Sequence, residues 1–473
     1  MPVAGIPFFW LILHSMQLKK LLSSHKPGGI PDLLVLAIPM VVSTAADGVM
    51  TFTDRLFLAR VGSEQMNAAL GGGISYQMLL FFFMGLTGYS TALVAQYFGA
   101  GALRKAPQAT FQAILITLVA WPVVLLLKPL AQSFFYTMHL SEIQIHYQIQ
   151  YMDVLAWGGL FGMLRMTMGC FFAGIGKSKI VMTASVTAMV VNVVLDYILI
   201  FGKFGFPQMG VQGAALATVI GGASALTILL VAYFRPMNRS RFDIAHSFRF
   251  QPAIMKKLIK FGYPAGLELF LNFLAFFLMT AMYQSQGKAE ATAVTIMFNY
   301  DLVSFIPLLG IEIAVTSLAG RYMGAGRPQA AHRSALSAIK TGMVYSIVIL
   351  LLFLFIPETL VRVFHPKEFS PYFEKAVPIA VDMIRIASLY VLAQAVMVSL
   401  IGTLRGAGDT LYTMMVSVGA NWAFIPLLYL CLYVFHTSVP FAWFVIVAIY
   451  LIFCLVIYRR FRSGKWKTLQ IIK

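Results

Sequence analysis

Charged residues are scarce in this sequence: only 11% of its 473 residues are Asp, Glu, Lys or Arg, whereas soluble proteins average about 25%. This shortage excludes a disordered chain, a nucleic-acid-binding module and a cytosolic enzyme. Cysteine is scarce as well. Cys170, Cys431 and Cys454 all lie in apolar segments, so neither a disulfide framework nor a metal site is indicated.

The usual signatures of an intramembrane enzyme are also missing, since the sequence has neither a paired-aspartate prenyl site nor a His-Glu metal motif. Residues 174–178 (Gly-Ile-Gly-Lys-Ser) look like the end of a phosphate-binding loop, but that loop requires a glycine where Phe171 stands. An apolar segment precedes the motif instead of a strand. We interpret it as a turn between helices, and we predict a protein that is not an enzyme and carries no cofactor.

Long hydrophobic runs dominate what is present: 60% of the residues are hydrophobic and the mean hydropathy is +0.82. A membrane-spanning helix needs about 20 apolar residues. Twelve runs are long enough, at roughly 32–58, 68–97, 109–135, 150–173, 180–202, 211–233, 259–284, 291–322, 337–361, 379–403, 411–435 and 438–458. We therefore predict an all-α polytopic membrane protein with twelve transmembrane helices and the lipid bilayer, not nucleic acid, as its partner.

The basic residues predict the orientation of the chain. With the N-terminus in the cytoplasm, 25 Lys and Arg residues fall on the cytoplasmic side and eight on the opposite side, while Arg165 and Arg385 lie inside spans. Cytoplasmic loops carry the excess of basic residues. We therefore expect a multi-pass inner-membrane protein with both termini cytoplasmic. Residues 1–30 are expected to form a cytoplasmic or interfacial segment, because their apolar run is too short to span.

The two halves of the sequence repeat each other. At an offset of 225 residues Pro39 matches Pro264, and Tyr97–Gly101 matches Tyr322–Gly326. At an offset of 232, residues 174–176 match residues 406–408. Six spans per half make a parallel repeat, which in transporters places the substrate between two rocking halves. We predict pseudo-symmetric six-helix lobes: an N-lobe (31–233), a basic linker (234–258), a C-lobe (259–461) and a cytoplasmic tail (462–473).

Several polar residues lie inside the predicted spans, where a charged side chain costs roughly 2.5–3.5 kcal/mol on insertion scales. They are Asp47 and Asp54 in the first span, Arg165 in the fourth, Asn192 and Asp196 in the fifth, Glu268 and Asn272 in the seventh, and Glu312 in the eighth. Hard oxygen ligands suit Na⁺, and paired carboxylates suit a proton. Simpler roles stay open: Asp54 with Arg55 as a solvated pair at a helix end, and Arg165 as a counter-ion to Asp47, Asp54 or Asp196.

The order of several motifs resembles the MATE (multidrug and toxic compound extrusion) family from about residue 30 to 460. The matching segments are Pro39 followed by Asp54, Tyr97–Gly101, Asn192–Tyr197 with Phe201 and Gly202, Gly210–Thr218, Gly262 with Pro264 and Gly266, and Leu404–Thr410. The resemblance implies an antiporter that exports organic, often cationic compounds in exchange for H⁺ or Na⁺. It also implies a functional monomer whose partners are the small-molecule substrate and the coupling ion.

The family pattern further implies a cation site in the N-lobe. Its residues here are Asp54, Asn192, Asp196 and Thr218 with the carbonyl group of Ala214, and Na⁺ is a candidate ligand of the first three. In the C-lobe this sequence departs from the pattern, because two acidic positions hold Asn272 and Gln394. We therefore place ion coupling in the N-lobe. An accessory or substrate cavity is assigned to Asp47, Arg165, Glu268, Asn272, Glu312 and Gln394.

A flippase for a lipid-linked precursor is the alternative that the same superfamily suggests. A pyrophosphate-linked lipid requires a large cationic cavity, and Arg165 is the one intramembrane cation that the sequence places away from span ends. That disfavours a flippase. A channel is disfavoured because the twofold repeat with charged lobes is typical of alternating access.

Overall fold

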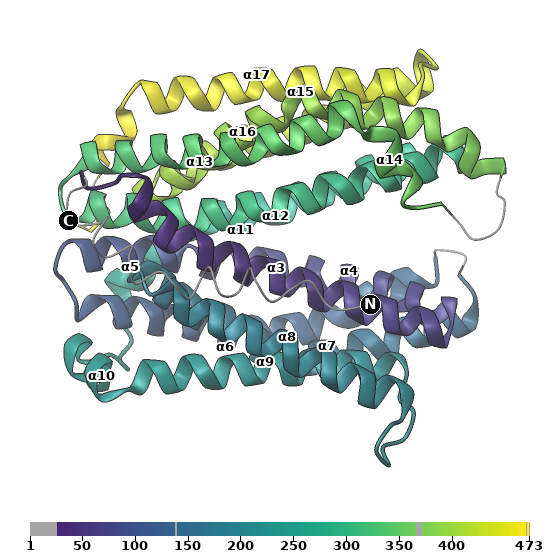
Figure 1. Cartoon of the computed structure of the whole chain (residues 1–473). Helices are drawn as coiled ribbons and strands as arrows, with labels where there is room; N and C mark the ends of the chain where they lie inside the picture. The colour runs from purple at the N-terminus through teal and green to yellow at the C-terminus, as the bar shows by residue number, and fades with distance from the viewer. Residues whose placement is uncertain (1–25, 138–139, 366–370, 470, 473) are drawn as a thin grey trace, which may run out of the picture.

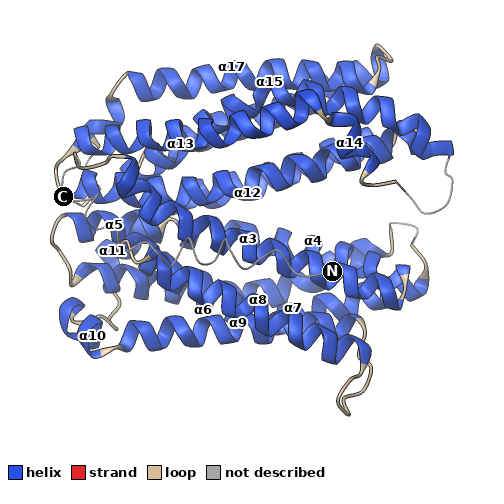
Figure 2. Ribbon diagram, viewed as in Figure 1, coloured by secondary structure: helices blue, strands red, loops and turns tan. Residues whose placement is uncertain are grey.

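The computed structural model describes residues 26–137, 140–365, 371–469 and 471–472, and these residues form helices and turns without any β-strand (Figures 1 and 2). Twelve of the helical segments are long and apolar enough to cross a membrane, so the predicted fold class is confirmed. The predicted N-terminal segment falls almost entirely outside the described residues. Residues 174–178 do form a turn, which joins two helices.

The twelve spans follow one another in chain order. They are α3 (Ile30–Val61), α4 with α5 (Ser63–Gly88 and Ser90–Gly99), α6 (Lys105–Phe135), α7 (Glu142–Gly174), α8 (Ser178–Phe201), α9 (Val211–Phe234), α11 (Pro252–Gln284), α12 (Lys288–Gly324), α13 (Pro328–Phe355), α15 (Pro371–Ala407), α16 with the π-helical turn η2 (Thr410–Tyr429 and Leu430–Val434) and α17 (Val439–Arg462). Short helices connect or follow them: α10 (Pro236–Phe242), η1 (Ile244–His246), α14 (Pro357–Arg362) and η3 (Lys465–Thr468).

The first helix of each repeat contacts both halves of the molecule. Helix α3 runs obliquely between the two groups of helices in Figure 1 and packs on α8 and on α12. Helix α11 packs on α4 and on α16 in the same way. Leu33 and Leu36 of α3, for example, share a hydrophobic cluster with Leu308 and Leu318 of α12. The lobe boundaries at residues 233 and 259 stay a prediction. Helices that precede residue 233 pack closely against helices that follow residue 259.

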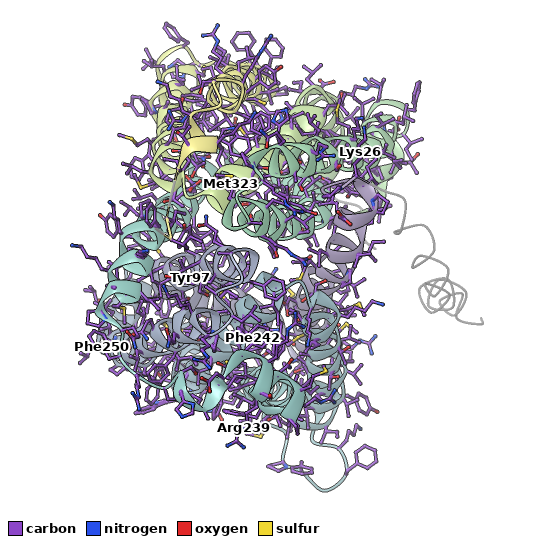
Figure 3. All side chains as sticks on the ribbon, turned by 90° about the vertical axis from the view of Figure 1, so that its left-hand side faces the viewer. Lys26, Tyr97, Arg239, Phe242, Phe250 and Met323 are labelled. Atoms are coloured by element: carbon purple, nitrogen blue, oxygen red, sulfur yellow. The ribbon has the colours of Figure 1, made fainter. Side chains whose placement is uncertain are left out.

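The basic linker, which contains α10 and η1, lies at one end of the bundle, and so does η3. This end is on the left in Figure 1 and faces the viewer in Figure 3. We call this end the basic face, because Lys26 and Arg239 are exposed on it and the basic linker at 234–258 lies there. Lys26 lies across this face from Arg239 and Phe250. That the basic face is cytoplasmic stays a prediction.

Glycines bring the two halves into backbone contact close to the basic face. A Cβ atom on Gly99 of α5 would lie 1.9 Å from the carbonyl oxygen of Arg321, and one on Gly324 of α12 would lie 2.0 Å from that of Gln96. Gly99 matches Gly324 in the repeat, and Gln96 matches Arg321. The two contacts are therefore equivalent by pseudo-symmetry, and only glycine fits at either position.

A second pair of close backbone contacts is also related by the pseudo-symmetry of the two halves. A Cβ atom on Gly85 of α4 would lie 2.6 Å from the Cα atom of Gly266, and one on Gly310 of α12 would lie 2.7 Å from that of Val41. Val41 and Gly266 are again repeat equivalents. We call these four contacts the glycine seam. They hold the halves together at the ends of α4, α5 and α12 that point to the basic face.

We expect Gly99→Ala to force the halves apart at the basic face, because the new methyl group has no space against the Arg321 carbonyl. Overpacking typically costs about 1–3 kcal/mol, which is enough to shift a two-state equilibrium roughly 5- to 150-fold. Double electron–electron resonance between spin labels at the exposed positions Arg104 and Arg327 is expected to show longer distances.

The matched control is Gly162→Ala in α7, where an added Cβ atom meets nothing within 4 Å. Its distance distribution is expected to equal that of the unsubstituted protein. The same distribution in the Gly99 variant would contradict the role given to the seam.

Candidate cation-binding site

Asp54 lies at the centre of a buried polar site that three helices form. Its side chain, on α3, is 5% exposed. The Asn192 side-chain amide on α8 donates a hydrogen bond of 3.2 Å to Asp54 Oδ1, and the Thr218 hydroxyl on α9 donates one of 3.1 Å to Asp54 Oδ2. The structure therefore brings together residues that are up to 164 positions apart in the sequence.

Asp196 completes this site one helical turn after Asn192. Its side chain is fully buried, and its carboxyl group lies close enough to that of Asp54 for the two groups to interact electrostatically. Among the described residues, no donor pairs with either Asp196 oxygen atom or with Asn192 Oδ1. Ala214, also fully buried, lies one turn before Thr218 on α9.

The chemistry of this site follows from its donors and acceptors. Two carboxyl groups in contact, at low dielectric constant, cannot both stay ionised unless a positive charge joins them. No described Lys or Arg forms a salt bridge with Asp54 or Asp196. A shared proton fits this arrangement, and so does a hard cation bound by carboxylate, amide and hydroxyl oxygens. The assignment of the site to a coupling ion stays a prediction.

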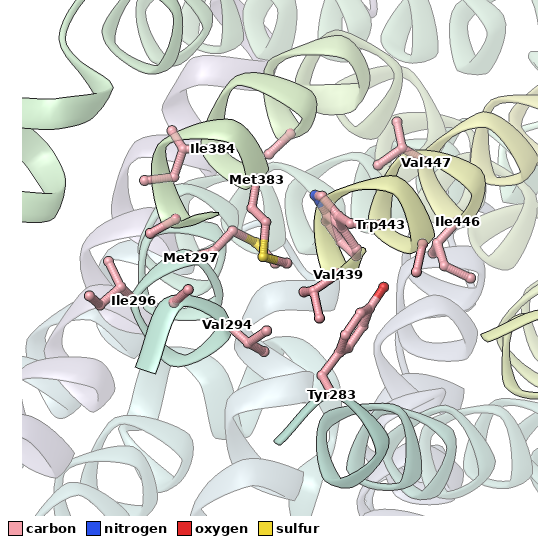
Figure 4. Packing of buried hydrophobic residues seen from close by; sticks show 14 of the residues in the cluster. Tyr283, Val294, Ile296, Met297, Met383, Ile384, Val439, Trp443, Ile446 and Val447 are labelled. Carbon is pink, nitrogen blue, oxygen red and sulfur yellow. The ribbon is translucent and has the colours of Figure 1, made fainter. Parts of the chain in front are cut away.

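The corresponding positions of the second half are apolar. At the repeat offsets, Asp54 matches Met279, Asn192 matches Phe424 and Asp196 matches Leu428. These three residues belong to one buried hydrophobic cluster, of which Figure 4 shows other members, among them Tyr283, Met297 and Trp443. The fold therefore does not require polar residues at these positions, and the polar set is particular to the first half.

Arg165 of α7 pairs with Asp47 of α3, and 3.0 Å separate Arg165 Nη1 from Asp47 Oδ1. Of the three partners considered from the sequence, the structure selects Asp47. Both side chains are partly exposed, 26% for Arg165 and 43% for Asp47. This pair leaves Asp54 and Asp196 without a basic partner.

Glu268 and Glu312, for which the sequence indicated no partner, share one arginine. Arg405 Nη2 lies 2.9 Å from Glu268 Oε2, and Arg405 Nη1 lies 2.5 Å from Glu312 Oε1. We call these three residues the C-lobe ion trio; it joins α11, α12 and α15. Arg405 is one of the 25 basic residues predicted for the cytoplasmic side, and that side stays a prediction; its side chain lies between three helices and is 27% exposed.

The remaining candidate residues lie apart from the Asp54 site. The Asn272 amide donates a 2.7 Å hydrogen bond to Ser417 and its oxygen accepts one of 3.2 Å from Asn421, so it joins α11 to α16. Gln394 of α15 is 8% exposed, and no described residue donates to its oxygen atom. Neither residue supplies the carboxylate that the family pattern has in this half.

A duplicated twelve-helix membrane protein with a buried acidic site between its helices is typical of a membrane transporter. Comparison with known proteins identifies the family: a family model described as MatE matches residues 39–198 and 264–430. This chain belongs to the MatE family of multidrug efflux transporters, and its members are transporters rather than enzymes.

Relatives and solved structures agree with this assignment. The chain is 27% identical over 454 residues to a protein of Thermotoga maritima named probable multidrug resistance protein NorM, covering 93% of this chain and 94% of that protein. It is 25% identical over 416 residues to a protein of Bradyrhizobium diazoefficiens with the same name, covering 86% and 88%. Its fold resembles that of a MOP superfamily transporter from Pyrococcus furiosus, with TM-score 0.85 at 18% identity, over 94% of this chain and 97% of that one.

We expect Arg405→Leu to destabilise the folded protein by about 3–5 kcal/mol, because it leaves two carboxylates buried together without their shared cation. The free energy of unfolding in detergent measures the effect. Arg385→Leu is the matched control: it lies on the same helix, is exposed, and forms no salt bridge with a described residue. We expect it to change stability by at most about 0.5 kcal/mol. Equal losses in both variants would show that the ion trio does not stabilise the C-lobe.

Proposed function

We propose that this protein is a cation-coupled antiporter that exports organic, cationic or amphipathic compounds in exchange for H⁺ or Na⁺. The observation that carries the proposal is that Asp54 and Asp196 are buried close together within the spans, and that neither forms a salt bridge with a described Lys or Arg. Such a site holds one positive charge readily and is poorly stable without it. The names of the relatives from Thermotoga maritima and Bradyrhizobium diazoefficiens support drug export as the activity.

The site is placed where its occupancy affects the arrangement of the helices. Asp54 lies on α3, which packs on both halves, whereas Asn192 and Thr218 lie on α8 and α9 of one half. A proton or Na⁺ bound between Asp54 and Asp196 changes the charge and the hydrogen bonds where α3 meets α8. A ligand that binds one arrangement of the lobes better than another shifts their populations, and in this way ion binding is coupled to the orientation of the lobes.

The membrane potential supplies enough free energy for this exchange. One charge that moves inward gains about 2.3 kcal/mol per 100 mV, which corresponds to a concentration ratio of roughly fortyfold at about 1.4 kcal/mol per decade. The glycine seam is closed at the basic face. We propose that the basic face is cytoplasmic, so that the halves are closed toward the cytoplasm, and that the protein acts as a monomer in the inner membrane.

The arginines of the interior support export of cationic compounds over the flipping of a pyrophosphate-linked lipid. Arg165 is neutralised by Asp47, and Arg405 by Glu268 and Glu312. A cavity for pyrophosphate needs cations that are free to bind it. These acids leave neither arginine available for that purpose.

Gradient-driven uptake of a fluorescent organic cation into proteoliposomes tests the proposal, with a pH gradient and a Na⁺ gradient imposed in separate experiments. Asp54→Asn and Asp196→Asn are each expected to reduce uptake at least tenfold, because the amide removes the charge that holds the cation. The matched control is Asp382→Asn on α15, an exposed aspartate without a salt bridge to a described residue. Unreduced rates in both site variants would reject the site, and the absence of uptake under either gradient would reject antiport.

A further inference from the structure

A groove of about 510 Å³ lies at the basic face, between the beginning of α3 and the first turns of α13. Three basic side chains and an apolar floor line it. The lining residues are Lys26, Gly29, Ile30, Pro31, Arg333, Leu336, Ser337 and Lys340. None of the functions above uses this groove.

The basic side chains of the groove are not neutralised by the protein. Within the described part of the chain, no carboxylate forms a salt bridge with Lys26, Arg333 or Lys340. The nearest acid in sequence, Asp32, does not line the groove. It accepts hydrogen bonds from the Gly28 amide at 2.8 Å and from the hydroxyl of Tyr322 at 2.9 Å. The groove therefore presents three positive charges without a counter-charge.

The shape of the groove combines this charge with exposed apolar surface at the edge of the membrane. Ile30 is the first residue of a membrane-spanning helix and is 41% exposed, as is Leu336. Arg333, Leu336 and Lys340 are spaced three and four residues apart, so they lie on one face of α13.

We propose that this groove binds an anionic phospholipid, with its phosphate group at Lys26, Arg333 and Lys340 and its acyl chains along Ile30 and Leu336. Basic pockets between membrane helices are suited to anionic headgroups. The apolar floor at the start of two spans favours a lipid over a free phosphate, which has no apolar part. The positive charge also disfavours residues 1–25 as the occupant, because Lys19 and Lys20 add to that charge.

The bound lipid connects the two halves of the protein. Helix α3 belongs to the first repeat and α13 to the second, and the Ser337 hydroxyl already donates a 3.0 Å hydrogen bond to the carbonyl oxygen of Gly28. A phosphate held by Lys26 and Arg333 adds a contact across the same boundary. The lipid therefore stabilises the arrangement in which the halves touch at the basic face.

Native mass spectrometry of the full-length protein in non-ionic detergent tests this proposal, with phosphatidylglycerol and phosphatidylcholine of identical acyl chains as probes. The unsubstituted protein is expected to bind phosphatidylglycerol more tightly. The double variant R333Q/K340Q is expected to lose about fivefold in affinity per cation, which corresponds to about 1 kcal/mol each. Equal binding of the two lipids by the unsubstituted protein would overturn the proposal.

The control double variant is R239Q/R249Q, which removes two exposed charges of the same kind from the linker. Arg239 lies across the basic face from Lys26 (Figure 3). We expect its affinity for phosphatidylglycerol to stay within twofold of the unsubstituted protein. An equal loss in both double variants would mean that only the overall charge matters, and the groove would not be the site.

Two further measurements identify the occupant without relying on the stability of a variant. Glycerol phosphate, a headgroup without acyl chains, is expected not to displace the lipid at equal concentration; displacement would assign the groove to a free phosphate. A photoreactive leucine in place of Leu336 is expected to crosslink to phospholipid. A crosslink to a peptide from residues 1–25 would overturn the proposal, because the chain itself would then fill the groove.

Discussion

The proposed function depends on two buried carboxyl groups, those of Asp54 and Asp196, that lie close together in an apolar helix bundle and form no salt bridge with a described Lys or Arg. Asp54 is held by Asn192 and Thr218, whereas no described residue donates a hydrogen bond to Asp196. At low dielectric constant the repulsion between two such charges is large. A bound positive charge would relieve this repulsion. Because Asp54 lies on a helix that contacts both halves, the proposed ion binding would act where the halves meet.

The two halves share one backbone plan but place their polar residues differently. Where the first half has Asp54 and Asp196, the second has Met279 and Leu428 in a hydrophobic cluster. The second half has its own buried charges, in which Arg405 forms salt bridges with two acids. These salt bridges join three helices, whereas the Asp54–Asp196 pair forms no salt bridge with a described Lys or Arg. We interpret the second half as the rigid part and the first half as the responsive part.

The fold was predictable from the sequence because a bilayer accepts helices of about 20 apolar residues and little else. The repeat was visible for the same reason, since glycine and proline positions recur at constant offsets. The choice of Asp47 as the partner of Arg165 was not predictable, because helical spacing leaves several acids within reach. Arg405 was missed because it lies three residues before a turn, where basic residues usually mark a cytoplasmic loop. Only the three-dimensional fold, in which α12 packs on α15, brings Glu268 and Glu312 to its side chain.

The paired contacts of the glycine seam have a mechanical consequence. Gly99 meets Arg321 as Gly324 meets Gln96, so one pseudo-twofold axis relates both contacts. A rotation of one half against the other about that axis would change both contacts by the same amount. Substitution of one glycine in the seam should therefore have an effect similar to substitution of its equivalent in the other repeat. The two glycines lie 225 residues apart in the chain.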